Sequence, residues 1–302
     1  MSVLSRRAWI AGALAGLPFS QRPARAQASP TGDLRVVDLV LDGDAALARQ
    51  ARLLVPTHLS RNEPQRLLVL LHGLGETNNP SLGLRAWSEL YGLVASYQRL
   101  RRPPLLPTQT GSRYLTEARE AELAKELADR PFTGFACVCP VTPNPRRSGA
   151  PAQALDRYTD WITGTLLPAV RQRIRVANGP FGVGLDGCSL GGYVGIEVFL
   201  RRPDVFGAIG MVQGAVGVAR VTSYAERLAR ALDRVGPRSI HLESSSADPF
   251  RAATEQLSAR LEALEVPHVL RVPPGPHNQP WLREIGTAEM LLFHDRALLP
   301  NR

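Results

Sequence analysis

The chain has 302 residues, of which 44% are hydrophobic and 21% are charged, and it contains only three cysteines. This composition is typical of a folded globular protein, and it excludes a disordered chain and a small disulfide-stapled domain. The formal charge is +9, but the arginine pairs lie in separate segments with no aromatic residues between them, so we expect no nucleic-acid binding.

Residues 1–26 have the pattern of a cleaved export signal. Arg6 and Arg7 precede an apolar stretch over residues 8–19, and Ala24-Arg25-Ala26 follows as an A-x-A cleavage site. The paired arginines resemble a twin-arginine signal, which implies a bacterial protein that the Tat machinery exports to the periplasm or beyond. A disordered basic N-terminus is the alternative. Twelve apolar residues are too few to span a bilayer, so we expect no stable membrane span.

Residues 27–302 are predicted to form a single α/β domain, with a formal charge of +5 because the first 26 residues carry four arginines and no acid. Residues 34–41 and 49–55 alternate as an antiparallel pair of strands. Residues 67–71 are continuously apolar, as in a buried parallel strand, and they lead into His72-Gly73-Leu74-Gly75. Strand and helix patterns then alternate, which predicts a mostly parallel central sheet flanked by helices.

Residues 77–134 form an enlarged insertion after this first parallel strand. Trp87, Leu90, Tyr91 and Val94 recur at helical spacing, and residues 115–129 predict a second, more charged helix. Packing of the first helix on the sheet is favoured over a substrate-binding aromatic stripe. We also expect the insertion to form a partial lid or one wall of a pocket.

The cysteines do not predict a disulfide framework. Cys137 and Cys139 stand two apart on one strand, which is a poor geometry for a disulfide, and Cys188 is the third. We therefore expect buried free thiols, although one pair stays open at this point. No His, Cys, Asp or Glu cluster has metal-ligand spacing, so we predict no metal and no cofactor.

The segment Gly187-Cys188-Ser189-Leu190-Gly191 has the pattern of a nucleophile elbow, a strand-to-helix turn that presents a reactive serine. Residues 180–186 predict the strand, and residues 190–200 predict the helix. The serine of such a turn has a positive φ, and glycine is needed two residues before and after it because a side chain would collide there. Ser189 is therefore the candidate nucleophile.

The same segment also satisfies a second motif. Residues 182–187 match G-x-G-x-x-G, with Asp204 as a possible ribose-binding acid, as in dinucleotide-binding domains. That motif requires a strand before Gly182 and a helix that begins within the glycines. Residues 158–176 predict a helix instead, so the nucleophile interpretation is favoured.

His277 is the candidate general base. It lies in Pro273-Pro274-Gly275-Pro276-His277-Asn278, a turn-forming loop after a predicted strand, where this architecture places a catalytic histidine. His241 and His268 lie in predicted strands and His294 lies on the last predicted helix, which favours packing roles for all three.

Asp248 is the candidate acid that orients the histidine, because it follows a predicted strand in a loop of small polar residues. The alternative role for Asp248 is to cap the helix that begins near Phe250. Glu243 is the reserve acid. The oxyanion hole requires two backbone N–H groups, one after the nucleophile and one from an earlier loop, which indicates Leu190 and Leu74.

Taken together, the HGLG and GCSLGG motifs, the late aspartate and the segment PGPHNQPW resemble the α/β-hydrolase serine esterases, in particular the esterase D-like and feruloyl-esterase-like groups. The resemblance spans residues 34–296. It implies a triad of Ser189, Asp248 and His277, with an oxyanion hole at Leu74 and Leu190. The long insertion departs from the family pattern, in which a single helix follows the HG strand.

These features predict an exported serine hydrolase that cleaves small-molecule or polymer-linked carboxylic esters through an acyl-enzyme. Three alternatives remain open from the sequence. An acyltransferase would use the same triad, a prolyl-peptidase-like enzyme shares the elbow but usually carries a further domain, and a non-catalytic binding protein would use only the scaffold.

Overall fold

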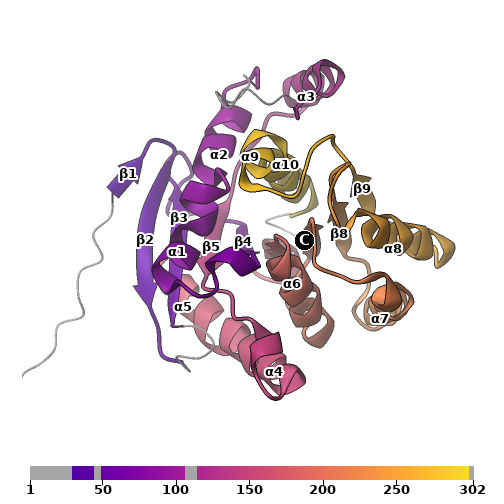
Figure 1. Cartoon of the computed structure of the whole chain (residues 1–302). Coiled ribbons are helices and arrows are strands. Elements are labelled where there is room, and N and C mark those ends of the chain that lie inside the picture. Colours follow the sequence, from indigo (N-terminus) through magenta and orange to yellow (C-terminus); the bar gives the residue numbers. More distant parts are fainter. Residues whose placement is uncertain (1–28, 44–48, 106–113, 299–302) are drawn as a thin grey trace, which may run out of the picture.

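The computed structural model describes residues 29–43, 49–105 and 114–298 (Figure 1). The predicted export signal lies outside these residues. Among the described residues, no helix has the length and apolar character that crossing a membrane requires.

The described part of the chain contains one nine-stranded sheet with the order β1-β2-β3-β5-β4-β6-β7-β8-β9. The predicted entry pair is confirmed, because β2 and β3 are antiparallel. From β5 to β9 every neighbouring pair is parallel, as the sequence predicts. The strands are β1 (Ser29–Thr31), β2 (Leu34–Val40), β3 (Gln50–Pro56), β4 (Leu67–Leu71), β5 (Ala136–Pro140), β6 (Val183–Gly187), β7 (Ala208–Val212), β8 (Ser239–Glu243) and β9 (Val269–Arg271).

Helices cover both faces of the sheet (Figure 1). Side chains of a strand alternate between its two faces, and β4 shows this directly because all five of its residues are apolar and buried. Leu67, Val69 and Leu71 join the core under α4 to α8, whereas Leu68 and Leu70 join the core under α2, α3 and α10. The helices are α1 (Pro80–Arg85), α2 (Leu93–Arg101), α3 (Glu117–Asp129), α4 (Pro151–Trp161), α5 (Leu167–Arg171), α6 (Leu190–Arg201), α7 (Val221–Val235), α8 (Arg251–Ala263), α9 (Gln279–Trp281) and α10 (Thr287–Ala297).

Two predicted elements have an end that differs from the structure by three residues or more. The helix predicted over residues 158–176 begins at Pro151, where proline fits the first helical position, and continues through a π-helical turn (Ile162–Leu166) to Arg171. The strand predicted over residues 180–186 is preceded by a 3₁₀ turn (Pro180–Gly182) and spans Val183–Gly187. The glycines of the G-x-G-x-x-G match therefore lie before and inside a strand, not in a strand-to-helix turn.

The insertion contains α1, α2 and α3. The single helix predicted through Trp87, Leu90, Tyr91 and Val94 is wrong, because Gly92 with a φ of 73° separates a π-helical turn (Ala86–Leu90) from α2. The aromatic side chains nevertheless pack on the sheet, as predicted. Trp87 and Tyr91 are buried in the core beneath α2 and α10. Helix α3 begins after Thr116, whose side chain accepts a hydrogen bond from the Arg119 N–H, a standard N-cap. Arg119 also binds Glu289 of α10 at 2.5 Å, which ties the outer helix of the insertion to the C-terminal helix.

All three cysteines lie among the described residues, and each is buried and unpaired. Cys137 and Cys139 both point into the core beneath α2 and α10, as their spacing predicts. Burial raises the pKa of each thiol, which keeps these groups protonated and unreactive.

Candidate active site

Ser189 lies at the turn between β6 and α6. Its φ is 56°, in the left-handed region that L residues rarely adopt, and this confirms the predicted positive φ. The turn is held by its neighbours, because the Ser189 N–H donates to the Val212 carbonyl at 3.0 Å and the Ser189 carbonyl accepts from the Ala215 N–H at 2.9 Å. Strong local hydrogen bonding therefore maintains a strained backbone at the residue that is predicted to react.

The two glycines that flank the serine are required by contact distances. A Cβ on Gly187 would lie 2.3 Å from the carbonyl carbon of Gly191, and a Cβ on Gly191 would lie 2.1 Å from the Leu71 carbonyl oxygen. These obstacles are backbone atoms, which cannot rotate away. The sequence argument for glycine at both positions is confirmed.

The predicted base and acid lie in the loops after β9 and β8. These two loops run side by side, because the Ala247 N–H donates to the Gly275 carbonyl at 2.9 Å and residues 247 and 276 form a parallel bridge. His277 Nε2 lies 3.1 Å from Ser189 Oγ, and His277 Nδ1 lies 2.9 Å from Asp248 Oδ1. The three side chains therefore form one hydrogen-bonded chain across residues that are far apart in sequence.

Asp248 is firmly fixed. Its Oδ2 accepts from the Ser244 hydroxyl at 2.6 Å, and its Oδ1 also accepts from the Phe250 N–H at 3.0 Å. One carboxylate oxygen therefore serves both the histidine and the backbone before α8. The helix-capping alternative is not confirmed, because α8 begins at Arg251 and has no side-chain cap. The reserve acid, Glu243, is buried, and neither of its carboxylate oxygens has a hydrogen-bond partner among the described residues, so it does not bind His277. Burial raises the pKa of Glu243 well above its usual value.

The backbone N–H groups of Leu74 and Leu190 both stand at helix starts. Leu190 is the first residue of α6, and Leu74 is the first residue of a 3₁₀ turn (Leu74–Glu76). The first N–H groups of a helix have no intrahelical acceptor and carry the positive end of the helix dipole. Both groups are therefore suited to bind a negatively charged oxygen.

His72 orients the loop that carries Leu74. Its Nε2 accepts from the Thr142 N–H at 2.8 Å, which leaves the proton on Nδ1 to bind the Gly73 carbonyl at 2.9 Å. Burial lowers the pKa of His72, which keeps it neutral. The prediction that His72 orients the loop is confirmed.

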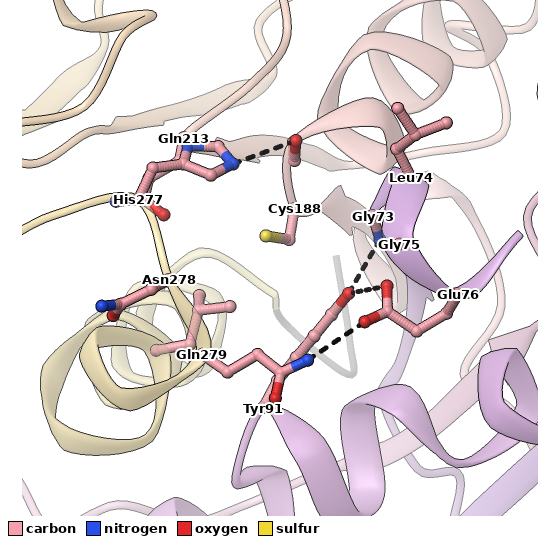
Figure 2. Close-up of a pocket in the computed structure, with 12 residues that line it drawn as sticks. Gly73, Leu74, Gly75, Glu76, Tyr91, Cys188, Gln213, His277, Asn278 and Gln279 are labelled. Atoms are coloured by element: carbon pink, nitrogen blue, oxygen red, sulfur yellow. Dashed lines mark hydrogen bonds between the residues drawn. The ribbon is translucent and has the colours of Figure 1, made fainter.

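Sequence reasoning missed a buried network beside this loop (Figure 2). The Tyr91 hydroxyl accepts from the Gly73 N–H at 3.0 Å and donates to Glu76 Oε2 at 2.5 Å, while Gln279 Nε2 donates to Glu76 Oε1 at 3.2 Å. The network connects the Gly73–Glu76 loop to the start of α9, directly after His277. Burial is the main reason that the pKa of Tyr91 is strongly raised, so this hydroxyl keeps its proton. Glu76, which directly follows the HGLG motif, is the sequence feature from which this network could have been predicted.

A cavity of about 260 Å³ opens at Ser189 and His277. Its wall combines apolar side chains with the Tyr91–Glu76–Gln279 network; the lining residues are Gly73, Leu74, Gly75, Glu76, Tyr91, Cys188, Ser189, Gln213, His277, Asn278, Gln279 and Leu282. Of the insertion's described residues, Tyr91 alone lines this cavity. The expectation of a wall therefore rests on one side chain, and residues 106–113 of the expected lid lie outside the described residues.

The other C-terminal histidines lie elsewhere. His294 on α10 binds the buried Asp186 at 2.9 Å, and His241 on β8 is 1% exposed beside Phe293. His268 precedes β9 instead of lying within it, and it binds the Ser258 hydroxyl at 2.6 Å. Within the described residues, no group of three or more His, Cys, Asp or Glu side chains is arranged to hold a metal ion.

A family described as "Putative esterase" matches residues 92–285. A comparison with curated protein sequences gives no significant match.

Several solved structures share the fold. A ferulic acid esterase is 15% identical, with a TM-score of 0.63, over 90% of this chain and 100% of that chain. An S-formylglutathione hydrolase from Staphylococcus aureus is 13% identical, with a TM-score of 0.58, over 87% and 100% of the two chains. A fluorophosphonate-binding serine hydrolase of the same organism is 14% identical, with a TM-score of 0.58, over 87% and 99%. These similarities confirm the predicted α/β-hydrolase fold.

Proposed function

The chain belongs to this esterase family, and we propose that it hydrolyses carboxylic esters through an acyl-enzyme on Ser189. The hydrogen-bonded chain from Ser189 through His277 to Asp248 carries the proposal, with distances of 3.1 Å and 2.9 Å at the edge of the cavity. These are the contacts that a serine, its general base and an orienting acid require.

In the first step, His277 Nε2 takes the proton of the Ser189 hydroxyl while Oγ attacks the ester carbonyl carbon. The Asp248 carboxylate holds the Nδ1 proton and stabilises the imidazolium that forms. The tetrahedral intermediate then collapses, the bond to the alcohol oxygen breaks, and the imidazolium gives its proton to the leaving alcohol. Water repeats the sequence on the acyl-enzyme and releases the carboxylic acid.

The negative charge of each tetrahedral intermediate falls on the former carbonyl oxygen. The N–H groups of Leu74 and Leu190 are the proposed donors to that oxygen, because both begin helical turns, Leu74 in the lining of the cavity and Leu190 directly after Ser189. Removing one such donor typically costs about 100- to 1,000-fold in rate. The reaction requires no metal and no cofactor.

Hydrolysis is favoured over transfer to another acceptor. The His277 side chain is 26% exposed, so water reaches the base that must activate the second nucleophile. An acyltransferase has to shield the acyl-enzyme from water to favour its alcohol acceptor. Product analysis with added alcohols distinguishes the two activities.

The test is intact-mass labelling of residues 27–302 with a fluorophosphonate. We expect one adduct on the wild type, none on Ser189→Ala, and strongly slowed labelling of His277→Ala. Asp248→Asn is expected to lower kcat by about 10⁴-fold for a responsive ester, because the histidine loses its correct tautomer. A folded wild type without any adduct would leave a non-catalytic binding protein as the better interpretation.

We further propose that the protein acts outside the cytoplasm. The twin arginines, the short apolar stretch and the A-x-A site of residues 1–26 support export by the Tat machinery and a periplasmic or secreted location.

A further inference from the structure

Two arginines from separate loops cover one aromatic ring next to the nucleophile. The guanidinium of Arg146 lies 5.5 Å from the ring centre of Tyr193, and that of Arg220 lies 6.0 Å from the same centre. Arg146 belongs to the loop after β5, and Arg220 to the loop after β7. Parallel strands end at one edge of the sheet, so both loops lie at the edge that carries Ser189.

Hydrogen bonds connect this cluster to the nucleophile. Tyr193 stands one helical turn after Ser189 on α6, and its N–H donates to the Ser189 carbonyl at 3.2 Å. The Ala215 N–H, in the loop that leads to Arg220, donates to the same carbonyl at 2.9 Å. The residue after Arg146 also contacts the segment that follows the Leu74 loop, because the Arg147 side chain donates a hydrogen bond to the side chain of Asn78. The cluster of Arg146, Arg220 and Tyr193 therefore borders the reaction centre.

The arginines of this cluster have no acidic partner in the described part of the chain. No described carboxylate oxygen lies within 4.0 Å of Arg146 or Arg220. Other arginines near these helices are paired; Arg227 with Glu197 and Arg202 with Asp204 are examples. Tyr193 is only 5% exposed, so the ring is a fixed platform under two exposed guanidinium groups. Stacking on a ring immobilises a guanidinium and leaves its positive charge unneutralised. The Tyr193 and Tyr224 hydroxyls also lie within hydrogen-bonding reach of Arg220 and help to hold it in place.

The cavity lies on the other side of Ser189 and, unlike the cluster, is unfavourable for an anionic group. Tyr91 and Leu282 of the cavity belong to the core beneath α2 and α10, whereas Tyr193 belongs to the core beneath α4 to α8. The charged group next to the cavity's network is the buried Glu76, which accepts hydrogen bonds at both oxygens. An anionic group in that cavity would face a carboxylate, whereas on the Tyr193 side it would face two guanidinium groups.

We propose that Arg146 and Arg220, supported by Tyr193, form a binding subsite for an anionic group on one side of the substrate's ester bond, and that an uncharged group on the other side fills the cavity. This inference rests on the proposed esterase function and adds a substrate class to it. Carboxylates and phosphates both match the planar guanidinium fork, so either anion satisfies the chemistry.

The experiment compares two sets of esters by pH-stat. Esters of the first set carry a carboxylate on the acyl part, and esters of the second set carry it on the alcohol part. Each ester is compared with an ester that has a primary carboxamide in place of the carboxylate. A further ester in each set carries a phosphate instead, which identifies the preferred anion. In one of the two sets, we expect the wild type to have a kcat/KM about tenfold higher for the anionic ester than for the carboxamide ester. This ratio should fall as the salt concentration is raised. Arg146→Gln and Arg220→Gln should each reduce this ratio about threefold, and the double variant should abolish it.

Arg230→Gln is the matched control, because Arg230 is exposed on α7 and pairs with Glu226 at 3.6 Å, away from the cluster. It should keep the wild-type ratio. Equal kcat/KM values for anion and amide in both sets, on an enzyme that hydrolyses the amide-bearing esters, would overturn the subsite and leave the esterase function intact. Failure to hydrolyse any ester, together with no fluorophosphonate adduct, would overturn both.

Discussion

At the scale of single residues, the loop that carries Leu74, the proposed oxyanion donor, depends on a side chain that belongs to a different segment. Gly73 donates its N–H to the Tyr91 hydroxyl, which is in turn held by Glu76. Neither side chain is placed to accept the proton of Ser189. Tyr91 and Glu76 are therefore positioning residues, which act through the backbone that carries the Leu74 N–H.

We expect Tyr91→Phe to lower kcat about tenfold with a smaller change in KM. The substitution removes the acceptor of the Gly73 N–H and one donor to Glu76, so the Leu74 N–H loses part of its alignment with the developing oxyanion. Steady-state kinetics with a neutral ester measures the effect.

Tyr97→Phe is the control for this prediction. Tyr97 is fully buried in the same insertion but does not line the cavity, so removing its hydroxyl should leave kcat unchanged. Equal kcat values for Tyr91→Phe and the wild type would show that the network has no role in positioning the loop.

At the scale of elements, two of the three glycines in α6 have opposite requirements. A Cβ at Gly191 would lie 2.1 Å from the Leu71 carbonyl oxygen, whereas at Gly195 the nearest atom would be 3.9 Å away. The first glycine is needed for the close approach of helix and strand, and the second is not. The two positions form a natural pair for substitution.

Gly191→Ala should lower the free energy of unfolding by more than about 3 kcal/mol, because a backbone atom blocks the new methyl group. Gly195→Ala should raise it by about 0.5–1 kcal/mol, because alanine is the better helix former and the space is open. Urea unfolding of both variants tests this. The packing argument fails if both variants are destabilised equally.

Glu197 connects α6 to α7 and makes this contact sensitive to acid. Burial alone would raise the pKa of its carboxyl, but hydrogen bonds from Arg227, Tyr224 and Arg201 outweigh burial and hold the pKa at about 2. A depressed pKa stabilises the folded state above the unfolded value near 4.5, and this contribution is lost as the pH falls toward 2.

The free energy of unfolding should therefore fall when the pH is lowered from 5.5 to 2.5. We expect this fall to be about 2–3 kcal/mol larger in the wild type than in Glu197→Gln, which lacks the titrating group. Urea unfolding at both pH values gives the difference. Glu226→Gln, which removes an exposed carboxylate on α7, should behave like the wild type. Parallel pH profiles for Glu197→Gln and the wild type would contradict the assignment.

At the scale of the whole molecule, the proposed export makes a prediction about processing. In a bacterial host with a Tat system, the wild type should be recovered from the periplasm with Gln27 as its first residue. Arg6→Lys with Arg7→Lys should keep an unprocessed precursor in the cytoplasm, because the twin arginines are the signal that the machinery reads. Cell fractionation and intact mass measure both. Arg22→Lys makes the same change outside the pair and should export normally; export of the double variant would exclude the twin-arginine route.

Features that depend on near neighbours could be predicted from the sequence. The fully apolar β4 indicated a strand buried on both faces, and the spacing of Gly187 and Gly191 around Ser189 indicated the strand-to-helix turn. Both follow from local sterics and from the fixed periods of strands and helices, so they are readable without knowledge of the rest of the chain. Pro151 shows the limit of such patterns, since the helix began seven residues earlier than its apolar spacing predicted.

Contacts between groups that are distant in sequence became known only from the three-dimensional structure. It placed Asp248 instead of Glu243 beside His277, joined Tyr91 to Gly73 and Glu76, and brought Arg146 and Arg220 onto the ring of Tyr193. These contacts depend on the order of strands in the sheet and on the paths of the loops between them. That order is set by the burial of the two cores as a whole, which no local pattern of residues encodes.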